Sequence, residues 1–373
     1  MMSAQDNINI IIQIQKVDIL KIFLPAFVSF FIGIFAVKPI LKLMQKFNLQ
    51  KKKNVKYTID GRPATYAAKI DNDEGKTLYR MGGLVALVGV LGSLVVFRAL
   101  PFFFTADTIG KINFLSRSQT YVPIVALLGG AFIGLIDDLI VCGRLKKLSY
   151  YIGDGLSLKV RLGVAFVIAL FSAWWMTTKL DMSSVYVPFI GTLSVGWAIF
   201  SAIVVAAIVV TYAGSVIDGV DGLSGGVFSI IYTTVGIIAL MERRFDIAAL
   251  CFAIVGGLLA FLWFNIPPAI FMLSDVGSMP LTIVLAIVSI LTDSVAVLPI
   301  ISAPLVWSIG SVVLQLLSKK FRGGKKIFIA SPLHLHLQVK GWPKHMVSMR
   351  YWILTALFCS LGLVIFVAGG YFK

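Results

Sequence analysis

Residues 121–141 read YVPIVALLGGAFIGLIDDLIV, an apolar stretch whose charged residues, Asp137 and Asp138, come only near its end. A helix needs about 20 mostly apolar residues to cross the hydrocarbon core of a bilayer. Similar stretches recur along the whole chain of 373 residues, which is 58% hydrophobic and 13% charged. The mean hydropathy of +0.94 is too high for a water-soluble domain. Because a β-barrel would show short alternating segments instead, the sequence predicts an all-α, polytopic integral membrane helical bundle.

About ten transmembrane helices are expected. One apolar block, residues 281–317, is interrupted by Thr292, Asp293 and two prolines, Pro299 and Pro304. Proline removes a backbone donor and kinks a helix, so we expect one broken helix near residues 295–317. The expected spans are 19–44, 81–100, 121–141, 161–177, 196–213, 223–241, 247–264, 279–292, 295–317 and 348–370.

Basic residues divide the connecting segments into two sets. The segments after the first, third and ninth spans are rich in lysine and arginine, whereas those on the opposite side are short and nearly balanced. The positive-inside rule places the basic set in the cytoplasm and, with ten spans, both termini outside. We therefore expect a single transmembrane domain over residues 1–373. Its expected cytoplasmic loops are 45–80, 142–160, 214–222, 265–278 and 318–347.

The formal net charge of +16 is concentrated on the expected cytoplasmic side. For any single lysine, membrane orientation alone is a sufficient explanation. Together these charges can meet anionic lipid head groups or a phosphorylated soluble substrate. We expect membrane lipids as partners and no nucleic acid, and we allow for a homodimer.

Five aspartates are expected to converge on that side of the membrane. They follow the third, fifth and seventh spans, and are Asp137, Asp138, Asp218, Asp221 and Asp275. An aspartate beside a helix can be an ordinary cap or a solvated end. A carboxylate at a helix C-terminus, however, faces the negative end of the helix dipole and needs a compensating cation. Carboxylate oxygens suit Mg²⁺, which is usually shared with substrate phosphates. The pattern favours a nucleotide-diphosphate site.

Two further segments support such a site. In FNIPPAIFMLSD (264–275), Asn265 and two prolines break a helix and leave polar backbone that must be buried or line a cavity. The segment SPLHLHLQVKGWPKHM (331–346) holds all three histidines of the chain: His334, His336 and His345. Because cysteines and acidic residues are missing nearby, a phosphate-contacting role is favoured over structural zinc.

Taken in order, these motifs resemble a known family. The pair DD at a span end, DGVDGL (218–223), FNIPPAIFMLSDVGS (264–278), PLHLHLQVKGW (332–342) and VSMRYW (347–352) are similar to the MraY family of phospho-MurNAc-pentapeptide transferases. This family belongs to the polyprenyl-phosphate N-acetylhexosamine-1-phosphate transferase superfamily. The resemblance covers residues 19–370. It implies Mg²⁺-dependent transfer of phospho-MurNAc-pentapeptide from UDP-MurNAc-pentapeptide to undecaprenyl phosphate, giving lipid I and UMP. It also implies a multi-pass protein of the bacterial cytoplasmic (inner) membrane with its active site on the cytoplasmic face.

The resemblance also implies roles for individual residues. Asp275 matches the metal-binding aspartate, and Asp137 and Asp138 match the catalytic and polyprenyl-phosphate pair. The expected catalytic residues are thus Asp137, Asp138, Asp275 and His334, and the expected substrate-binding residues are Lys76, Arg161, Asp218, Asp221, Asn265 and His336.

The chain departs from the family pattern at several positions. The family segment GTPTMGG reads TLYRMGG here (77–83), Arg161 stands where lysine is usual, and Leu335 replaces the middle histidine of a triplet. Tyr212 and Ser215 replace asparagines, and Val141 replaces a lysine. These departures leave open how tightly the chain holds uridine and the polyprenyl phosphate.

Several alternatives remain open on the sequence alone. Asp137 or Asp138 can act as a general base or form a covalent phosphoryl intermediate. The runner-up function is a related transferase that uses another UDP-sugar such as UDP-GlcNAc. A transporter would also carry intramembrane carboxylates, but it tends to show paired halves and midplane charges, and we detect no repeat. An inactive scaffold is argued against by the retained aspartates.

Overall fold

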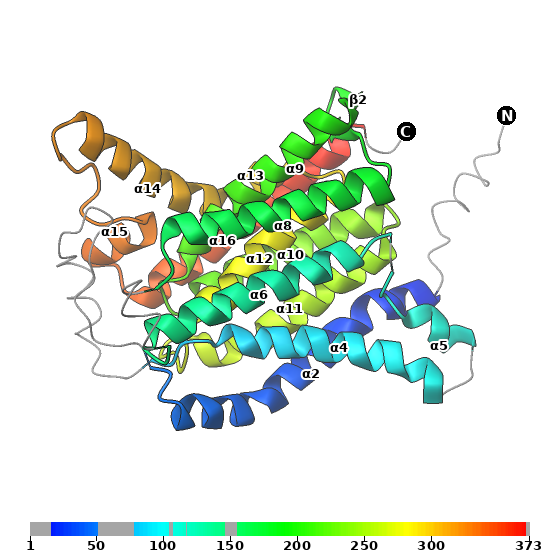
Figure 1. Ribbon diagram of the computed structural model, residues 1–373, viewed down its shortest axis with the longest axis horizontal. Helices are drawn as coiled ribbons and strands as arrows, with labels where there is room; N and C mark the ends of the chain where they lie inside the picture. Colours follow the sequence, from blue (N-terminus) through cyan, green and yellow to red (C-terminus); the bar gives the residue numbers. More distant parts are fainter. Residues whose placement is uncertain (1–15, 51–77, 104–106, 117, 146–154, 371–373) are drawn as a thin grey trace.

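The computed structural model describes residues 16–50, 78–103, 107–116, 118–145 and 155–370, which form an elongated bundle of long helices (Figure 1). The long helices are α2 (Lys16–Lys46), α4 (Gly83–Phe103), α6 (Tyr121–Val141), α8 (Leu158–Lys179), α9 (Gly196–Tyr212), α10 (Leu223–Met241), α11 (Phe245–Asn265), α12 (Ser274–Leu291), α14 (Ala303–Phe321) and α16 (Lys344–Ala368). The shorter elements are α5 (Asp107–Ile112), the 3₁₀ helix η1 (Ala213–Ile217), α13 (Leu298–Ile301) and α15 (Leu333–Val339).

Nine helices in the described ranges are long and apolar enough to cross a membrane: α2, α4, α6, α8, α9 extended through η1, α10, α11, α12 and α16. The predicted all-α, polytopic membrane fold is confirmed. The tenth expected span, residues 295–317, corresponds to α13 and α14, which are separated at Ser302. The expected break is therefore present. It coincides with Pro304 in the first turn of α14, a position where proline starts a helix readily.

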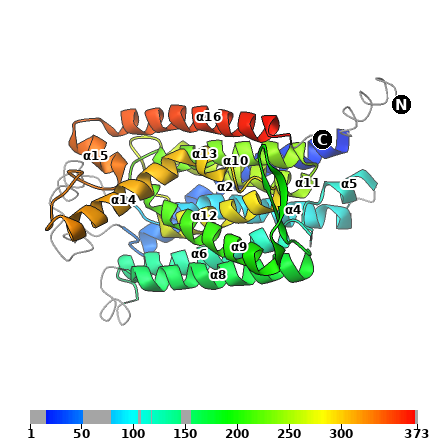
Figure 2. The ribbon, with the colours of Figure 1, turned by 90° about the horizontal axis from the view of Figure 1, so that it is seen from above.

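Three helices form the centre of the bundle. Most side chains of α10 and α11 are buried, and those of α12 are buried at almost every position. In the view of Figure 2, α12 lies between α16 on one side and α8 on the other. The outer helices carry many exposed large apolar side chains, as a lipid-facing surface requires.

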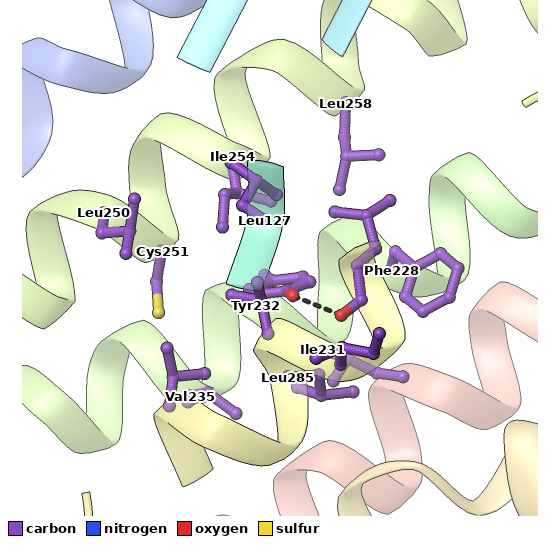
Figure 3. Close-up of a cluster of buried hydrophobic side chains, with 14 of the residues drawn as sticks. Leu127, Phe228, Ile231, Tyr232, Val235, Leu250, Cys251, Ile254, Leu258 and Leu285 are labelled. Atoms are coloured by element: carbon purple, nitrogen blue, oxygen red, sulfur yellow. Dashed lines mark hydrogen bonds between the residues drawn. The ribbon is translucent and has the colours of Figure 1, made fainter. Parts of the chain in front are cut away.

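The apolar core also holds a hydrogen-bonded tyrosine. Tyr232 of α10 is fully buried among aliphatic side chains of α10, α11 and α12, and its hydroxyl donates a 2.6 Å hydrogen bond to the carbonyl of Leu281 (Figure 3). A buried hydroxyl without a partner would be costly, so this bond fixes α10 against α12 near the middle of the bundle.

Glycines let two neighbouring helices approach α12 closely. A Cβ added at Gly134 of α6 would lie 2.6 Å from the carbonyl carbon of Asp275, and one at Gly83 of α4 would lie 2.5 Å from the Cα of Gly277. Real Cβ atoms do not approach backbone so closely. The end of α6 and the start of α4 are thereby held directly against the first turn of α12, where the candidate site is built.

A small β-hairpin lies at the end of the bundle opposite to the candidate site. Strands β1 (Ser184–Val187) and β2 (Gly191–Ser194) pair antiparallel, with Val185 opposite Leu193. No strands were expected there from the sequence. The start of α2 and the end of α16 lie at this same end of the bundle (Figure 1).

Candidate active site

Three carboxylates meet where α6 ends and α12 begins. Asp137 and Asp138 occupy the last turn of α6, and their side chains are fully buried. Asp275 lies in the first turn of α12, and its side chain is 18% exposed. Asp275 is therefore the member of the group that solvent or a ligand reaches. The close approach at Gly134 brings the two helices together at this point.

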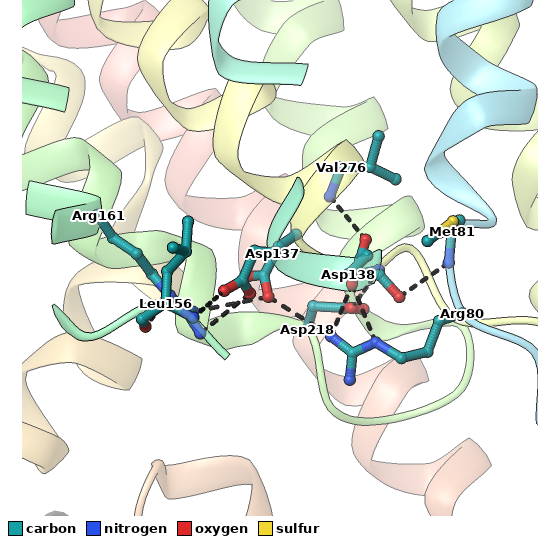
Figure 4. Close-up of polar contacts among 10 residues, drawn as sticks. Arg80, Met81, Asp137, Asp138, Leu156, Arg161, Asp218 and Val276 are labelled. Carbon is teal, nitrogen blue, oxygen red and sulfur yellow. Dashed lines mark hydrogen bonds and ion pairs between the residues drawn. The ribbon is translucent and has the colours of Figure 1, made fainter. Parts of the chain in front are cut away.

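Two arginines compensate the charge of these carboxylates (Figure 4). Arg80, just before α4, places Nη2 2.8 Å and Nε 2.9 Å from Oδ1 of Asp138. Arg161 of α8 places Nη2 3.0 Å from Oδ2 of Asp137. Both guanidinium groups also approach Oδ2 of Asp275, at 3.4 Å from Arg80 and 3.6 Å from Arg161.

Backbone donors complete the partners of the buried pair. The amide of Leu156 donates to Oδ1 of Asp137 at 2.5 Å, and that of Val276 donates to Oδ2 of Asp138 at 3.1 Å. Buried ionised groups are tolerated when they are paired and hydrogen-bonded. The pair of carboxylates is thus a fixed support that orients two guanidinium groups around Asp275.

Asp218 lies beside this group and connects it to α10. Its Oδ1 accepts from the hydroxyl of Ser224 at 2.8 Å, and its Oδ2 accepts from the amide of Ser274 at 2.7 Å. Burial raises the pKa of Asp218, while the two hydrogen bonds act in the opposite direction. Ser274 has a φ of +59°, which is unusual for a residue other than glycine. Asp218 therefore holds a strained residue directly before Asp275.

Asp221 contacts residues of α16. Its Oδ2 is 3.3 Å from Nζ of Lys344, and its carbonyl accepts from Ser348 at 2.7 Å. Asn265 uses its side chain to join two loops: Oδ1 accepts from the amide of Gly222 at 2.9 Å, and Nδ2 donates to the carbonyl of Phe271 at 2.8 Å. The substrate-binding roles of Asp221 and Asn265 stay predictions.

The histidine segment contacts the glycine-rich turn from the side of α15. His334 is buried, and a Cβ added at Gly219 would lie 3.1 Å from its Nε2. Burial lowers the pKa of His334 to about 4, so the imidazole is neutral near pH 7. His336 is more exposed; its Nδ1 accepts from the amide of Ile329 at 3.2 Å. His334 thus lies next to Gly219 of the DGVDGL turn, whereas His336 bonds to the backbone of Ile329.

The structure brings Asp137, Asp138, Asp218, Asp275 and Arg161 together. Lys76 lies outside the described residues. Arg80 is the residue that the sequence analysis missed as a site candidate. The only signal for it was the altered segment TLYRMGG, in which a basic side chain stands next to the methionine and glycines that begin α4.

The chemistry of this group suits a divalent metal that is shared with a substrate. Within the part of the chain that the structure describes, no three histidine, cysteine or acidic side chains are placed to form a metal cage. Mg²⁺ seldom needs such a cage, because it is usually held by one or two carboxylates together with phosphate oxygens and water. Three carboxylates, those of Asp137, Asp138 and Asp275, share only two guanidinium groups. The partly exposed Asp275 is suited to be the carboxylate that binds such a metal ion.

Known proteins match most of the chain. Residues 120–293, which contain Asp137, Asp138, Asp218, Asp221 and Asp275, match the model of glycosyl transferase family 4. The chain is 29% identical over 327 residues to a phospho-N-acetylmuramoyl-pentapeptide-transferase of Rubrobacter xylanophilus, covering 85% of this chain and 90% of that protein. It is 31% identical over 288 residues to the protein of that name from Bacillus thuringiensis, covering 76% and 82%.

Proposed function

Because this chain belongs to the phospho-N-acetylmuramoyl-pentapeptide-transferase family, we propose that it transfers phospho-MurNAc-pentapeptide from UDP-MurNAc-pentapeptide to undecaprenyl phosphate. An oxygen of the acceptor phosphate forms a bond to the sugar-linked phosphorus. The bond from that phosphorus to the oxygen of the other phosphate breaks, and UMP leaves with the electron pair. The products are lipid I and UMP.

The observation that carries this proposal is the convergence of Arg80 and Arg161 on Asp275 at one end of a membrane bundle. Guanidinium groups bind phosphate oxygens through parallel hydrogen bonds. Negative charge builds on the departing UMP, so fixed positive charge beside the bond that breaks lowers the barrier. Asp137 and Asp138 hold the two arginines in place, so the positive charges do not have to move during the reaction.

Asp275 would hold the Mg²⁺ ion. When bound, that ion supplies Lewis-acid stabilisation of the charge on the diphosphate. The acceptor phosphate has a second pKa of about 6 and is mostly ionised near neutral pH. A general base among the aspartates is therefore not required at neutral pH, although the pair Asp137 and Asp138 can supply one.

We place the site on the cytoplasmic face of the bacterial inner membrane. Basic residues of the described chain support this orientation, because Lys319, Lys320, Lys325 and Lys326 follow or end α14, which extends towards the same end of the bundle as the site (Figure 1). The positive-inside rule assigns such segments to the cytoplasm. The expected homodimer stays a prediction.

The test is an assay of UMP release by the purified protein in detergent with undecaprenyl phosphate and Mg²⁺. UDP-MurNAc-pentapeptide, UDP-MurNAc and UDP-GlcNAc are supplied in parallel. We expect strong preference for the pentapeptide substrate. Equal or faster release from UDP-GlcNAc would instead assign the chain to the runner-up reaction.

A further inference from the structure

Arg80 is held in the site from both its backbone and its side chain. The amide of Arg80 donates to the carbonyl of Leu49 at 3.0 Å, and neighbouring Tyr79 exchanges backbone hydrogen bonds with Ile270 and Met272 at 3.2 and 2.9 Å. Its guanidinium group forms the two bonds to Asp138 described above, and its side chain is only 15% exposed. The charge is thus fixed in position before any ligand binds.

The same guanidinium group reaches the carboxylate that would hold the metal. Nη2 of Arg80 and Nη1 of Arg161 approach the same oxygen, Oδ2 of Asp275, at 3.4 and 3.6 Å. Arginine stays protonated in proteins, and the guanidinium group of Arg80 is paired with Asp138 as well as with Asp275. Arg80 is therefore a permanent cation beside Asp275.

A permanent cation at this place has opposite effects on the two ligands of the site. It repels a divalent cation at Asp275 and attracts the phosphates that the cation would bridge. We infer that Arg80 takes over part of the charge compensation in this protein, so that the site binds phosphate more tightly and the divalent metal more weakly than it would with a neutral residue at position 80. The inference rests on the proposed function for the identity of the phosphate ligand and the metal.

The test compares Arg80→Gln, which removes the charge, with Arg80→Lys, which keeps the charge but lacks the paired N–H donors of the guanidinium group. Arg144→Gln is the matched control, because Arg144 is an exposed arginine in the segment that follows α6. Both measurements use the full-length protein in detergent. Mn²⁺ binding is measured by electron paramagnetic resonance, and UMP binding is measured by calorimetry in the presence of a chelator that removes divalent metal ions.

We expect Arg80→Gln to bind Mn²⁺ at least about tenfold more tightly, which corresponds to ~1.4 kcal/mol, and to bind UMP at least about tenfold more weakly. Arg80→Lys should stay within about threefold of the wild-type protein for Mn²⁺, and Arg144→Gln should match it for both ligands. General structural damage would weaken the binding of both ligands. Tighter binding of Mn²⁺ therefore cannot result from loss of structure. Unchanged or weaker Mn²⁺ binding by Arg80→Gln, or an Arg80→Lys protein that behaves like Arg80→Gln, would overturn it.

Loss of Arg80 leaves Asp138 buried without its main cation, so folding is checked by thermal unfolding. Mn²⁺ should raise the unfolding midpoint of Arg80→Gln by more than that of the wild-type protein, because the metal replaces the missing charge. If Arg80→Gln does not fold, Arg80→Thr is the second neutral variant, with the same expectations. None of these measurements needs turnover. A wild-type protein that releases no UMP would refute the proposed function while the binding data still decide the role of Arg80.

Discussion

Gly134 sets the distance between the buried aspartates and Asp275. A Cβ at this position would lie 2.6 Å from the carbonyl carbon of Asp275 and 2.7 Å from the Cα of Val276. Both atoms belong to the backbone, so neither can move aside as a flexible side chain would. Ordinary van der Waals contact begins near 3.4 Å, and Gly134→Ala must therefore push α6 and α12 apart by about 1 Å.

The displacement acts where the site is most sensitive. Asp137 and Asp138 follow Gly134 by one turn, so their arginines would move relative to Asp275. A misplacement of about 1 Å in a reacting group can reduce turnover about 100-fold, and overpacking of a tight interface costs about 1–3 kcal/mol of stability. We expect Gly134→Ala to lose UMP release by about 100-fold and to unfold at a lower temperature.

The matched control is Gly129→Ala on the same helix. A Cβ at Gly129 would meet its nearest neighbour, Cδ1 of Ile168, at 3.6 Å, which is an ordinary contact. This variant should keep wild-type activity and stability. Normal turnover by Gly134→Ala, or equal losses in both variants, would refute the argument that this contact positions the site.

Three further outcomes follow from the same geometry. Asp275→Asn should lose turnover by orders of magnitude and should weaken Mn²⁺ binding measured by paramagnetic resonance, because it removes the accessible charge; near-normal turnover in saturating Mg²⁺ would exclude Asp275 as the ligand. The pKa of His334 is lowered from 6.5 to about 4 by burial, so its share of stability is present above pH 6.5 and is lost as the pH falls towards 4. We expect the free energy of unfolding, measured in detergent, to fall by about 2 kcal/mol between pH 7 and pH 5. In the His334→Gln variant the free energy of unfolding should fall by less over the same range, and an equal fall in both proteins would contradict this. Single cysteines at Lys325 and Val187 should be labelled from the cytoplasm and from outside, respectively, and the reverse pattern would overturn the expected orientation.

The positions of most helices could be predicted from the sequence because the bilayer imposes one length on every apolar segment. Asp137, Asp138 and Asp275 were predictable for a related reason: a carboxylate at the edge of an apolar span is costly and stands out. Their convergence also followed from simple counting of crossings. These features depend on local composition, which the sequence displays directly.

Contacts between distant segments could not be predicted in the same way. Arg80 looked like one of many basic residues beside a membrane. Its role appears only when residues 79–83 align with residues 270–273 and direct the guanidinium group at Asp138 and Asp275. Asn265 was similarly ambiguous, because nothing in its sequence context showed that both ends of its amide are used to join two loops. The β1–β2 hairpin is too short to produce a clear alternating pattern.

The central claim is that this site joins a phospho-sugar to a lipid phosphate. The most direct measurement is mass spectrometry of the lipid formed when the wild-type protein, in detergent, receives undecaprenyl phosphate, UDP-MurNAc-pentapeptide and Mg²⁺. We predict a lipid whose mass equals undecaprenyl phosphate plus one phospho-MurNAc-pentapeptide unit, formed in equal amount to the UMP released and missing with Asp275→Asn. Release of UMP without that lipid, or no lipid product with any UDP-sugar, would contradict the account.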